Sequence, residues 1–242
     1  MKKIVSFAAR AVFATMLLAA AGMAAANTTG GGVTADEALL RLKTGNAEFV
    51  ADDHTHLLHN STPAVRDEVA LGQHPYAIVL DCADSRLSPE IIFNKGLGEL
   101  FVVRVAGNIL APHQLGSIDY AVEHLGAKLI VVLGHSKCGA VNATVGALRA
   151  DGSCIVDATN DNIGSLVDAI SPAVEKVCRS NGGTATLEQS IDENVLHVAH
   201  KLFKKSPLVT EQVHLGNVKV IEARYDLHDG IVKWLGEAHP KK

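Results

Sequence analysis

Four short runs of β-branched and other apolar residues recur along this chain and limit it to a small number of folds. They are YAIVL (76–80), LFVVRV (100–105), KLIVVLG (128–134) and VKVIEARYD (218–226). Segments with apolar residues at helical spacing lie between most of them, such as QLGSIDYAVEHLG (114–126) and CGAVNATVGALRA (138–150). Nearly continuous apolar strands that alternate with helices are typical of a parallel sheet covered on both faces.

The rest of the chain fits one α/β domain. Further helices are predicted around TADEALLRLKTGNAEFV (34–50), PAVRDEVALG (63–72), SPEIIFNKG (88–96), IGSLVDAISPAVEKVCRS (163–180) and LEQSIDENVLHVAHKLF (187–203). Thr34 and Glu37 fit a capping box at the start of the first of these. The segment YDLHDGIVKWLG (225–236) predicts a closing hairpin with Asp229-Gly230 as its turn. We therefore predict a central, mainly parallel β-sheet flanked by helices, with an N-terminal helical arm, in a single domain spanning 27–242.

Residues 1–26 have the composition of a secretory signal peptide. Lys2 and Lys3 precede an apolar stretch that ends in small residues, AGMAAA (21–26), and this favours cleavage after Ala26. The alternative is an uncleaved membrane anchor, but the apolar run is short for a span. We expect a periplasmic or secreted protein that has no membrane attachment after cleavage.

The charge balance argues against a nucleic-acid partner. The full chain has a net charge of −4, and without residues 1–26, which hold Lys2, Lys3 and Arg10 and no acid, this becomes −7. A moderately acidic protein with no basic stripe in its sequence is a poor candidate for binding nucleic acid.

Polar residues follow directly after three of the predicted strands. DCADSR (81–86) ends the first, RVAGN (104–108) the second and GHSKCGA (134–140) the third. Ligands in open α/β sheets bind at the carboxyl ends of the strands. All three clusters should therefore lie at one edge of the sheet and form a site.

Cys82, His135 and Cys138 supply two thiolates and one imidazole at this edge. This donor set suits Zn²⁺, which takes four tetrahedral sulfur, nitrogen or oxygen ligands. Cys138 should also begin a helix, where unpaired N–H groups lower a thiol pKa. An ordinary disulfide between Cys82 and Cys138 is the alternative, but it explains neither His135 nor the charged residues beside Cys82.

Asp84 and Arg86 follow Cys82 in the first polar cluster. Three protein ligands leave a fourth metal position open, as in catalytic rather than structural zinc sites. Asp84 could fill that position or hydrogen-bond to a water bound there. Arg86 points to the same side of an extended chain and can hold Asp84 in a two-pronged ion pair.

The succession CADSR (82–86), RVAGN (104–108) and HSKCGA (135–140) resembles the β-class carbonic anhydrases, here of an exported bacterial type. The resemblance continues in IGSLVDAI, ENVLHV and ARYDLHDG and so covers nearly all of residues 27–242. It implies a lyase with one Zn²⁺ per subunit, held by Cys82, His135 and Cys138. Zinc-bound hydroxide would hydrate carbon dioxide reversibly to bicarbonate and a proton, with Asp84 and Arg86 as the catalytic dyad.

The resemblance has further implications. Arg104, Gly107 and Asn108 would line the active site. The protein would be a homodimer or homotetramer, with the arm at 34–50 crossing the partner. In some relatives the aspartate equivalent to Asp84 becomes the fourth zinc ligand in a closed state at lower pH.

Two positions depart from the family's patterns. Relatives that close at low pH tend to carry a tryptophan three residues before the first zinc cysteine, and this chain has Val79 there. We therefore expect a site that stays open. Asn94-Lys95 stands where the family usually has Asp-Gln, and this puts a possible substrate-side hydrogen bond in doubt.

The other two cysteines, Cys154 and Cys178, flank a segment outside the zinc motif. In an exported chain they could pair as a disulfide, although two free thiols fit the sequence nearly as well.

Other functions fit the same residues. A related enzyme could act on carbon disulfide or carbonyl sulfide, since access to the metal decides the substrate. A zinc-storing or structural domain without turnover is a further alternative, but it needs neither Asp84 nor Arg86.

Overall fold

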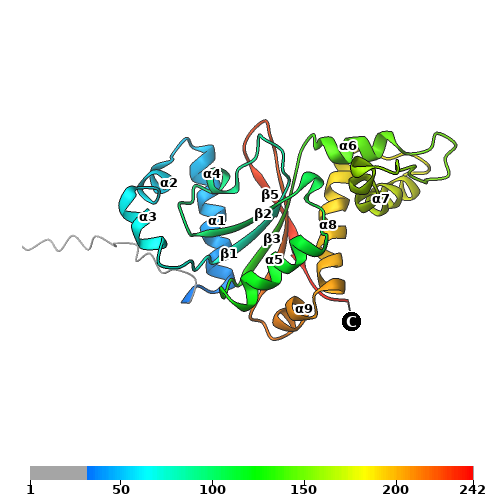
Figure 1. The fold of residues 1–242 in the computed structure, drawn as a ribbon. Helices are drawn as coiled ribbons and strands as arrows, with labels where there is room; N and C mark the ends of the chain where they lie inside the picture. The colour runs from blue at the N-terminus through cyan, green and yellow to red at the C-terminus, as the bar shows by residue number, and fades with distance from the viewer. Residues whose placement is uncertain (1–31, 242) are drawn as a thin grey trace, which may run out of the picture.

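A computed structural model describes residues 32–241, so the predicted signal peptide lies outside the described residues. A five-stranded sheet with flanking helices forms this part of the chain (Figure 1). The elements in order are α1 (Ala35–Val50), α2 (Thr55–His59), α3 (Pro63–Val69), β1 (Ala77–Asp81), α4 (Pro89–Ile92), β2 (Leu100–Arg104), the 3₁₀ turn η2 (Ala106–Asn108), α5 (Pro112–Glu123), β3 (Leu129–His135), α6 (Gly139–Gly146), α7 (Asn162–Ser180), α8 (Leu187–Lys205), α9 (Pro207–His214), β4 (Lys219–Tyr225) and β5 (Val232–Ala238).

The strands lie in the order β2-β1-β3-β4-β5. Strand β1 pairs in parallel with both β2 and β3, β3 pairs in parallel with β4, and only β5 is antiparallel to its neighbour. Every residue of β1 and β3 is buried, which explains why their sequences are apolar rather than alternating. The predicted mainly parallel α/β sheet is confirmed.

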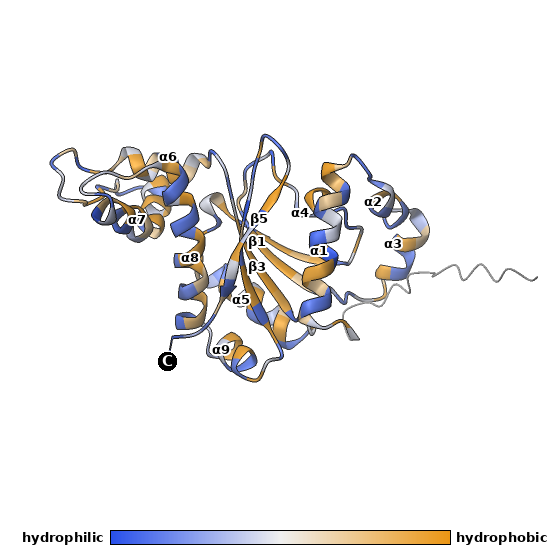
Figure 2. Cartoon of the chain, turned by 180° about the vertical axis from the view of Figure 1, so that it is seen from behind, coloured by the Kyte–Doolittle hydropathy of each residue, from blue (hydrophilic) through white to orange (hydrophobic). Residues whose placement is uncertain are grey.

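Each face of the sheet has its own hydrophobic core. Val79 and Val131 point to the face on which α1 and Phe93 pack. Ile78 and Val132 point to the other face, against α5, α8 and α9. Figure 2 shows the apolar strands between these helices. Helices α6 and α7 pack together beyond one end of the sheet, beside α8 (Figure 1).

Helix α1 begins as predicted, because Thr34 caps it by accepting a hydrogen bond from the Glu37 N–H. Its buried side lies against the chain's own sheet. Gly45 lies so close to the Phe93 carbonyl that an added Cβ would be 1.8 Å from its oxygen. Asn46 donates to the Gly230 carbonyl at 2.8 Å and accepts from the Val232 N–H at 2.9 Å. Contact between this arm and a partner subunit stays a prediction.

Local structure differs from the sequence prediction at three places. The connector after α1 contains the short helix α2. Helix α9 was not predicted, although Ser206 caps it and Pro207 occupies its first turn. The β4–β5 hairpin is present, but its connection spans 226–231 rather than two residues. In it Gly230, at φ +75°, donates to the Asp226 carbonyl.

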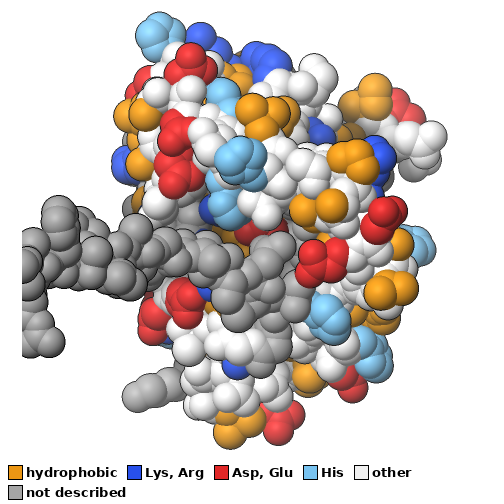
Figure 3. Space-filling view, turned by 90° about the vertical axis from the view of Figure 1, so that its left-hand side faces the viewer, with side chains coloured by type: hydrophobic (Ala, Val, Ile, Leu, Met, Phe, Trp, Pro, Cys, Tyr) orange, Lys and Arg blue, Asp and Glu red, His pale blue; other side chains and the backbone are white. Residues whose placement is uncertain are grey.

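No helix in the 32–241 range combines the length and the apolar character that a membrane span needs. On the face formed by the α1–α3 end, Figure 3 shows acidic, histidine, basic and apolar side chains interspersed, without a basic stripe.

Candidate metal centre

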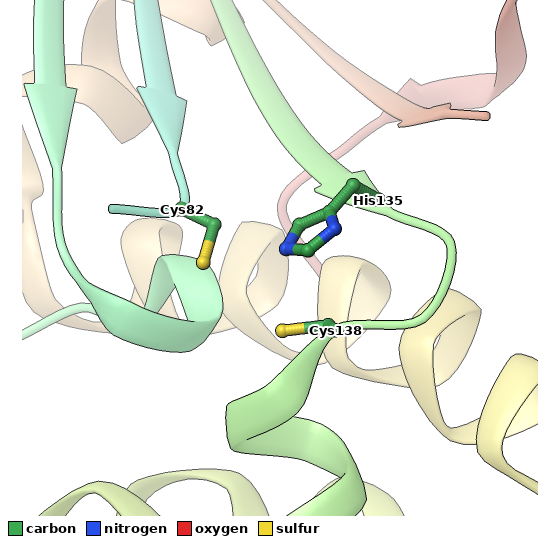
Figure 4. A group of neighbouring side chains, drawn as sticks. All are labelled: Cys82, His135 and Cys138. Carbon is green, nitrogen blue, oxygen red and sulfur yellow. The ribbon is translucent and has the colours of Figure 1, made fainter. Parts of the chain in front are cut away.

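Three side chains converge at the carboxyl edge of β1 and β3 (Figure 4). Cys82 follows the last residue of β1, His135 is the last residue of β3, and Cys138 is the N-cap of α6. Because β1 and β3 are parallel neighbours, their ends meet at one edge. The two sulfur atoms and a ring nitrogen all lie within 4.8 Å of one another, and all three residues are buried.

The orientation of His135 leaves one ring nitrogen free for a ligand. Its Nδ1 lies 3.0 Å from the Ser136 carbonyl oxygen, so Nδ1 carries the proton and donates. Its Nε2 is buried and has no hydrogen-bond partner. A histidine that donates through one nitrogen and presents the other is the usual arrangement of a metal ligand.

Contact between the two thiols shifts their pKa values in opposite directions. A hydrogen bond from Cys138 is the main cause that holds the pKa of Cys82 below its ordinary value, and the Gly107 N–H adds to it. The same contact raises the pKa of Cys138 above its ordinary value, which outweighs the lowering effect of N–H groups in α6. The N–H groups at the start of α6 do lower the pKa of Cys138, as the sequence predicts, and the contact with Cys82 opposes them. Two thiols and an unpartnered imidazole nitrogen fit zinc.

Asp84 and Arg86 form the predicted two-pronged ion pair beside these ligands. Arg86 donates from Nε to Oδ1 at 2.8 Å and from Nη2 to Oδ2 at 2.7 Å. The Asp84 side chain is only 16% exposed, and its Oδ2 lies 3.9 Å from His135 Nε2. Hydrogen bonds from Arg86 hold the pKa of Asp84 well below its usual range. Asp84 is thus an anionic hydrogen-bond acceptor next to Cys82, His135 and Cys138, which are called the metal-ligand cluster below.

Arg104 ends β2 and supports the backbone around this pair. Its Nε donates to the Cys82 carbonyl at 3.0 Å and its Nη2 to the Asp84 carbonyl at 2.7 Å. It therefore holds the 82–84 segment in place.

Gly107 and Asn108 lie in η2, directly against the metal-ligand cluster. The Gly107 N–H donates to the Cys82 sulfur at 3.3 Å. Gly107 has φ +69°, and an added Cβ would lie 2.6 Å from Ile170 Cδ1, so only glycine fits. Asn108 is also left-handed, at φ 41°, and its Nδ2 is buried without a partner.

Sequence reasoning missed Asn194. This residue of α8 is fully buried, and its Nδ2 donates to the Gly107 carbonyl at 2.9 Å. A signal was present in the sequence, because Asn194 lies three residues after Ile191 and four before Val198, both buried. An amide on the apolar face of a helix needs a specific partner.

Asp81 and Lys95 are two further ionisable residues that are buried near these strands. Asp81 accepts from the Cys82 N–H at 2.6 Å, and burial raises its pKa to about 7. It is therefore a local hydrogen-bonding residue. Lys95 is buried beside Gly45 of α1, and burial lowers its pKa.

The remaining cysteines, Cys154 and Cys178, are joined by a disulfide that ties the segment after α6 to the last turn of α7.

Comparison with known proteins agrees with this geometry. The family model for carbonic anhydrase matches residues 77–232. Carbonic anhydrase 2 of Mycobacterium tuberculosis is 37% identical over 189 residues, which cover 78% of this chain and 87% of the relative. The carbonic anhydrase of Mycolicibacterium smegmatis is 34% identical over 192 residues, covering 79% and 89%.

A solved structure is similar as well. The Coccomyxa β-carbonic anhydrase, in complex with acetazolamide, has a TM-score of 0.61 and 27% identity, over 72% of this chain and 78% of that one. The metal-ligand cluster at the sheet edge, the family match and these relatives together place the chain in the β-class carbonic anhydrase family.

Proposed function

We propose that this carbonic anhydrase hydrates carbon dioxide to bicarbonate and a proton at a zinc ion held by Cys82, His135 and Cys138. The observation that carries the proposal is the buried, unpartnered Nε2 of His135 between two thiols, with Asp84 beside it. Zinc bound there would act as a Lewis acid that lowers the pKa of a water molecule into the neutral range.

The roles of the chain's own residues follow from their contacts. Asp84 stays ionised because Arg86 bonds both of its oxygens, so it can only accept a hydrogen bond from the attacking group. Accepting that bond directs a lone pair toward the carbon of carbon dioxide. Arg104 fixes the Cys82 and Asp84 carbonyls, and Gly107 donates to the Cys82 sulfur, so both position the reacting groups.

The resting site is proposed to be open. Two hydrogen bonds from Arg86 hold the Asp84 carboxylate in its ion pair, which supports a role as hydrogen-bond acceptor rather than as fourth metal ligand. Position 79 supports the same expectation, because relatives that close at low pH tend to carry a tryptophan there and this chain has Val79.

Association into a homodimer or homotetramer is part of the proposal. Strand β2 is the edge of the parallel part of the sheet, and Leu100, Phe101 and Val102 on it are only half-buried. A second copy covering this edge would remove apolar surface and unpaired strand groups from water.

Export to the periplasm or the medium, after cleavage behind Ala26, is also proposed. The Cys154–Cys178 disulfide supports it, because disulfides persist in oxidising compartments.

Stopped-flow measurement of carbon dioxide hydration tests the function, using the zinc-loaded chain from Asn27 at mildly alkaline pH. Rapid hydration that is lost on chelation and restored by Zn²⁺ is the expected result. A folded, zinc-replete chain without hydration activity would contradict the proposal. Turnover of carbon disulfide or carbonyl sulfide by that chain would identify the related enzyme instead.

A further inference from the structure

A groove of about 680 Å³ lies between α7, α8, α9 and the C-terminal residues, away from the metal-ligand cluster. Its basic lining residues are His197, His200, Lys201, Lys204, Lys205 and Lys241, and its single acidic lining residue is Asp168. Ala169, Pro172, Phe203 and Pro240 provide apolar surface. The volume is within the range of small-molecule sites, about 300–1,000 Å³.

The basic side chains of this groove outnumber the acidic ones around them. Within residues 32–241, none of the four lysines or two histidines forms an ion pair with a carboxylate, although the protein as a whole is acidic. Burial lowers the pKa of His197, of His200 and of Lys201, and nearby lysines lower it further, although Glu193 offsets part of this for the two histidines. An anion would relieve this mutual repulsion and supply the missing partners.

From the groove's volume, apolar walls and unpaired basic side chains, we propose that it binds a small organic anion with two or more negative charges on an apolar body. Bicarbonate is far too small to fill it. A monoanion would leave most of the lysines unpaired, whereas a multiply charged ligand can bond to several at once while its body packs on Phe203 and the prolines.

Isothermal titration calorimetry of the zinc-loaded chain from Asn27 tests the site, with benzene-1,3,5-tricarboxylate as the probe. We expect it to bind at least about tenfold more tightly than benzoate, which has the same ring and one charge. Added salt should weaken binding. Citrate, which has three carboxylates but no ring, should bind more weakly than the probe. Absence of binding at millimolar probe, or equal affinities for probe and benzoate, would overturn the proposal.

Substitutions locate the binding. Lys201→Gln with Lys205→Gln should weaken binding about tenfold or more, through the loss of charge-assisted hydrogen bonds. The control is Arg66→Gln, an exposed position on α3 at the other end of the molecule (Figure 1), which should leave the affinity unchanged. Carbon dioxide hydration should be the same in all three proteins, which shows that they are folded. Equal weakening by Arg66→Gln would mean that net charge, and not this groove, attracts the probe.

A separate observation concerns Asn194. Its Nδ2 donates to the Gly107 carbonyl at 2.9 Å, and the N–H of the same glycine donates to the Cys82 sulfur at 3.3 Å. The amide orientation is determined by this contact, because the opposite orientation would set its oxygen against the carbonyl oxygen. Its Oδ1 is left buried and without a partner.

We infer that Asn194 is a positioning residue for the metal site, because it holds η2 so that the Gly107 N–H points at Cys82. It acts through Gly107, because its bond to the Gly107 carbonyl fixes the backbone of that residue and with it the direction of the Gly107 N–H. A hydrogen bond to a ligand sulfur reduces the sulfur's electron donation and so adjusts the metal. This inference rests on the proposed function for its metal.

Asn194→Leu removes the donor at nearly constant volume, and Ser190→Ala is the matched control. Ser190 is equally buried in α8, but its hydroxyl bonds only to the Thr186 carbonyl of that helix. For Asn194→Leu we expect zinc affinity to fall about 10–100-fold and the cysteine-to-metal absorption band of the cobalt-substituted protein to shift. Ser190→Ala should change neither. An Asn194→Leu protein with unchanged zinc affinity and cobalt spectrum would overturn the inference, whatever its hydration activity.

Discussion

Two regions of this molecule contain the same residue types and differ in what those residues can do. At the sheet edge, Cys82 and Cys138 lie beside the Asp84–Arg86 pair, and both arginine bonds are short, at 2.8 and 2.7 Å. In the α6–α7 segment, taken here as residues 147–161 with Cys178, a disulfide joins Cys154 to Cys178. There Arg149 bonds both oxygens of Asp157 at the same two distances.

The difference is in the surroundings. His135 lies between the first two thiols, and these three residues form the only metal-binding group of histidine, cysteine or acidic residues that the 32–241 range contains. The Asp84 side chain is 16% exposed, whereas that of Asp157 is 61% exposed. Converging strand ends thus provide a third ligand and exclude water, which a surface segment cannot do. Reactivity at the sheet edge follows from that placement and not from the residue types.

Replacement of Cys138 in one region and of the disulfide in the other should give the largest contrast. Cys138→Ser deletes a ligand, so hydration should fall by more than the 10–100-fold expected for an outer partner, together with the bound zinc. The Cys154→Ser, Cys178→Ser double variant should retain both zinc and activity. Metal analysis measures the bound zinc and stopped-flow hydration measures the activity. Comparable losses in both proteins would contradict the view that only the sheet edge holds the metal.

The two aspartates provide the next test. Asp84→Asn keeps the shape but weakens the acceptor, so hydration should fall about 10²–10⁴-fold, the range for a positioned acid–base group. Asp157→Asn should leave the rate unchanged, because its ion pair lies on the surface. Zinc content measured in parallel separates catalysis from metal loss. A full rate in Asp84→Asn would remove Asp84 from the proposed mechanism.

The sheet edge could be predicted from the sequence much better than the α6–α7 segment. Apolar strands that end in CADSR and HSKCGA determine both the fold and the position of Cys82, His135 and Cys138, because parallel strands must end at one edge. For Cys154 and Cys178 the sequence left two alternatives open, a disulfide or two free thiols. Disulfide pairing depends on the path of the loop between the cysteines, and that path leaves no periodic pattern in the sequence.

Contacts between distant segments were the least predictable. Asn194 reaches Gly107 across 87 residues of sequence, and only the packing of α8 on the sheet edge brings them together. The pKa shifts of Cys82 and Cys138 likewise arise from the contact between their thiols.

The disulfide should contribute to stability without contributing to activity. It closes a loop with a sequence separation of 24, which corresponds to ~3 kcal/mol of unfolding free energy on the chain-entropy model. Chemical denaturation of the Cys154→Ala, Cys178→Ala double variant under non-reducing conditions measures this loss. A thiol count on denatured, metal-free, unreduced wild-type protein should give two reactive thiols, from Cys82 and Cys138. Four would mean that the disulfide is absent.

The smallest expected difference concerns acid stability. Hydrogen bonds from Arg86 and Arg149 lower the pKa of Asp84 and of Asp157 respectively. A carboxyl group whose folded pKa is below its unfolded value stabilises the fold above the unfolded pKa, near 4, and that contribution is lost as pH falls through the folded pKa. Both arginines are about half exposed, but water screens the exposed Asp157 carboxylate more strongly than the mostly buried Asp84 carboxylate.

Arg86→Gln should therefore reduce the dependence of unfolding free energy on pH below about 5 more than Arg149→Gln does. Both arginine changes remove one positive charge, so each controls for the other's effect on net charge. Urea unfolding of the metal-free proteins between pH 3 and 6 measures the two slopes without interference from zinc. A larger change in Arg149→Gln would mean that exposure does not decide the strength of these two geometrically matched pairs, and the contrast between the regions would then rest on His135 and the thiols alone.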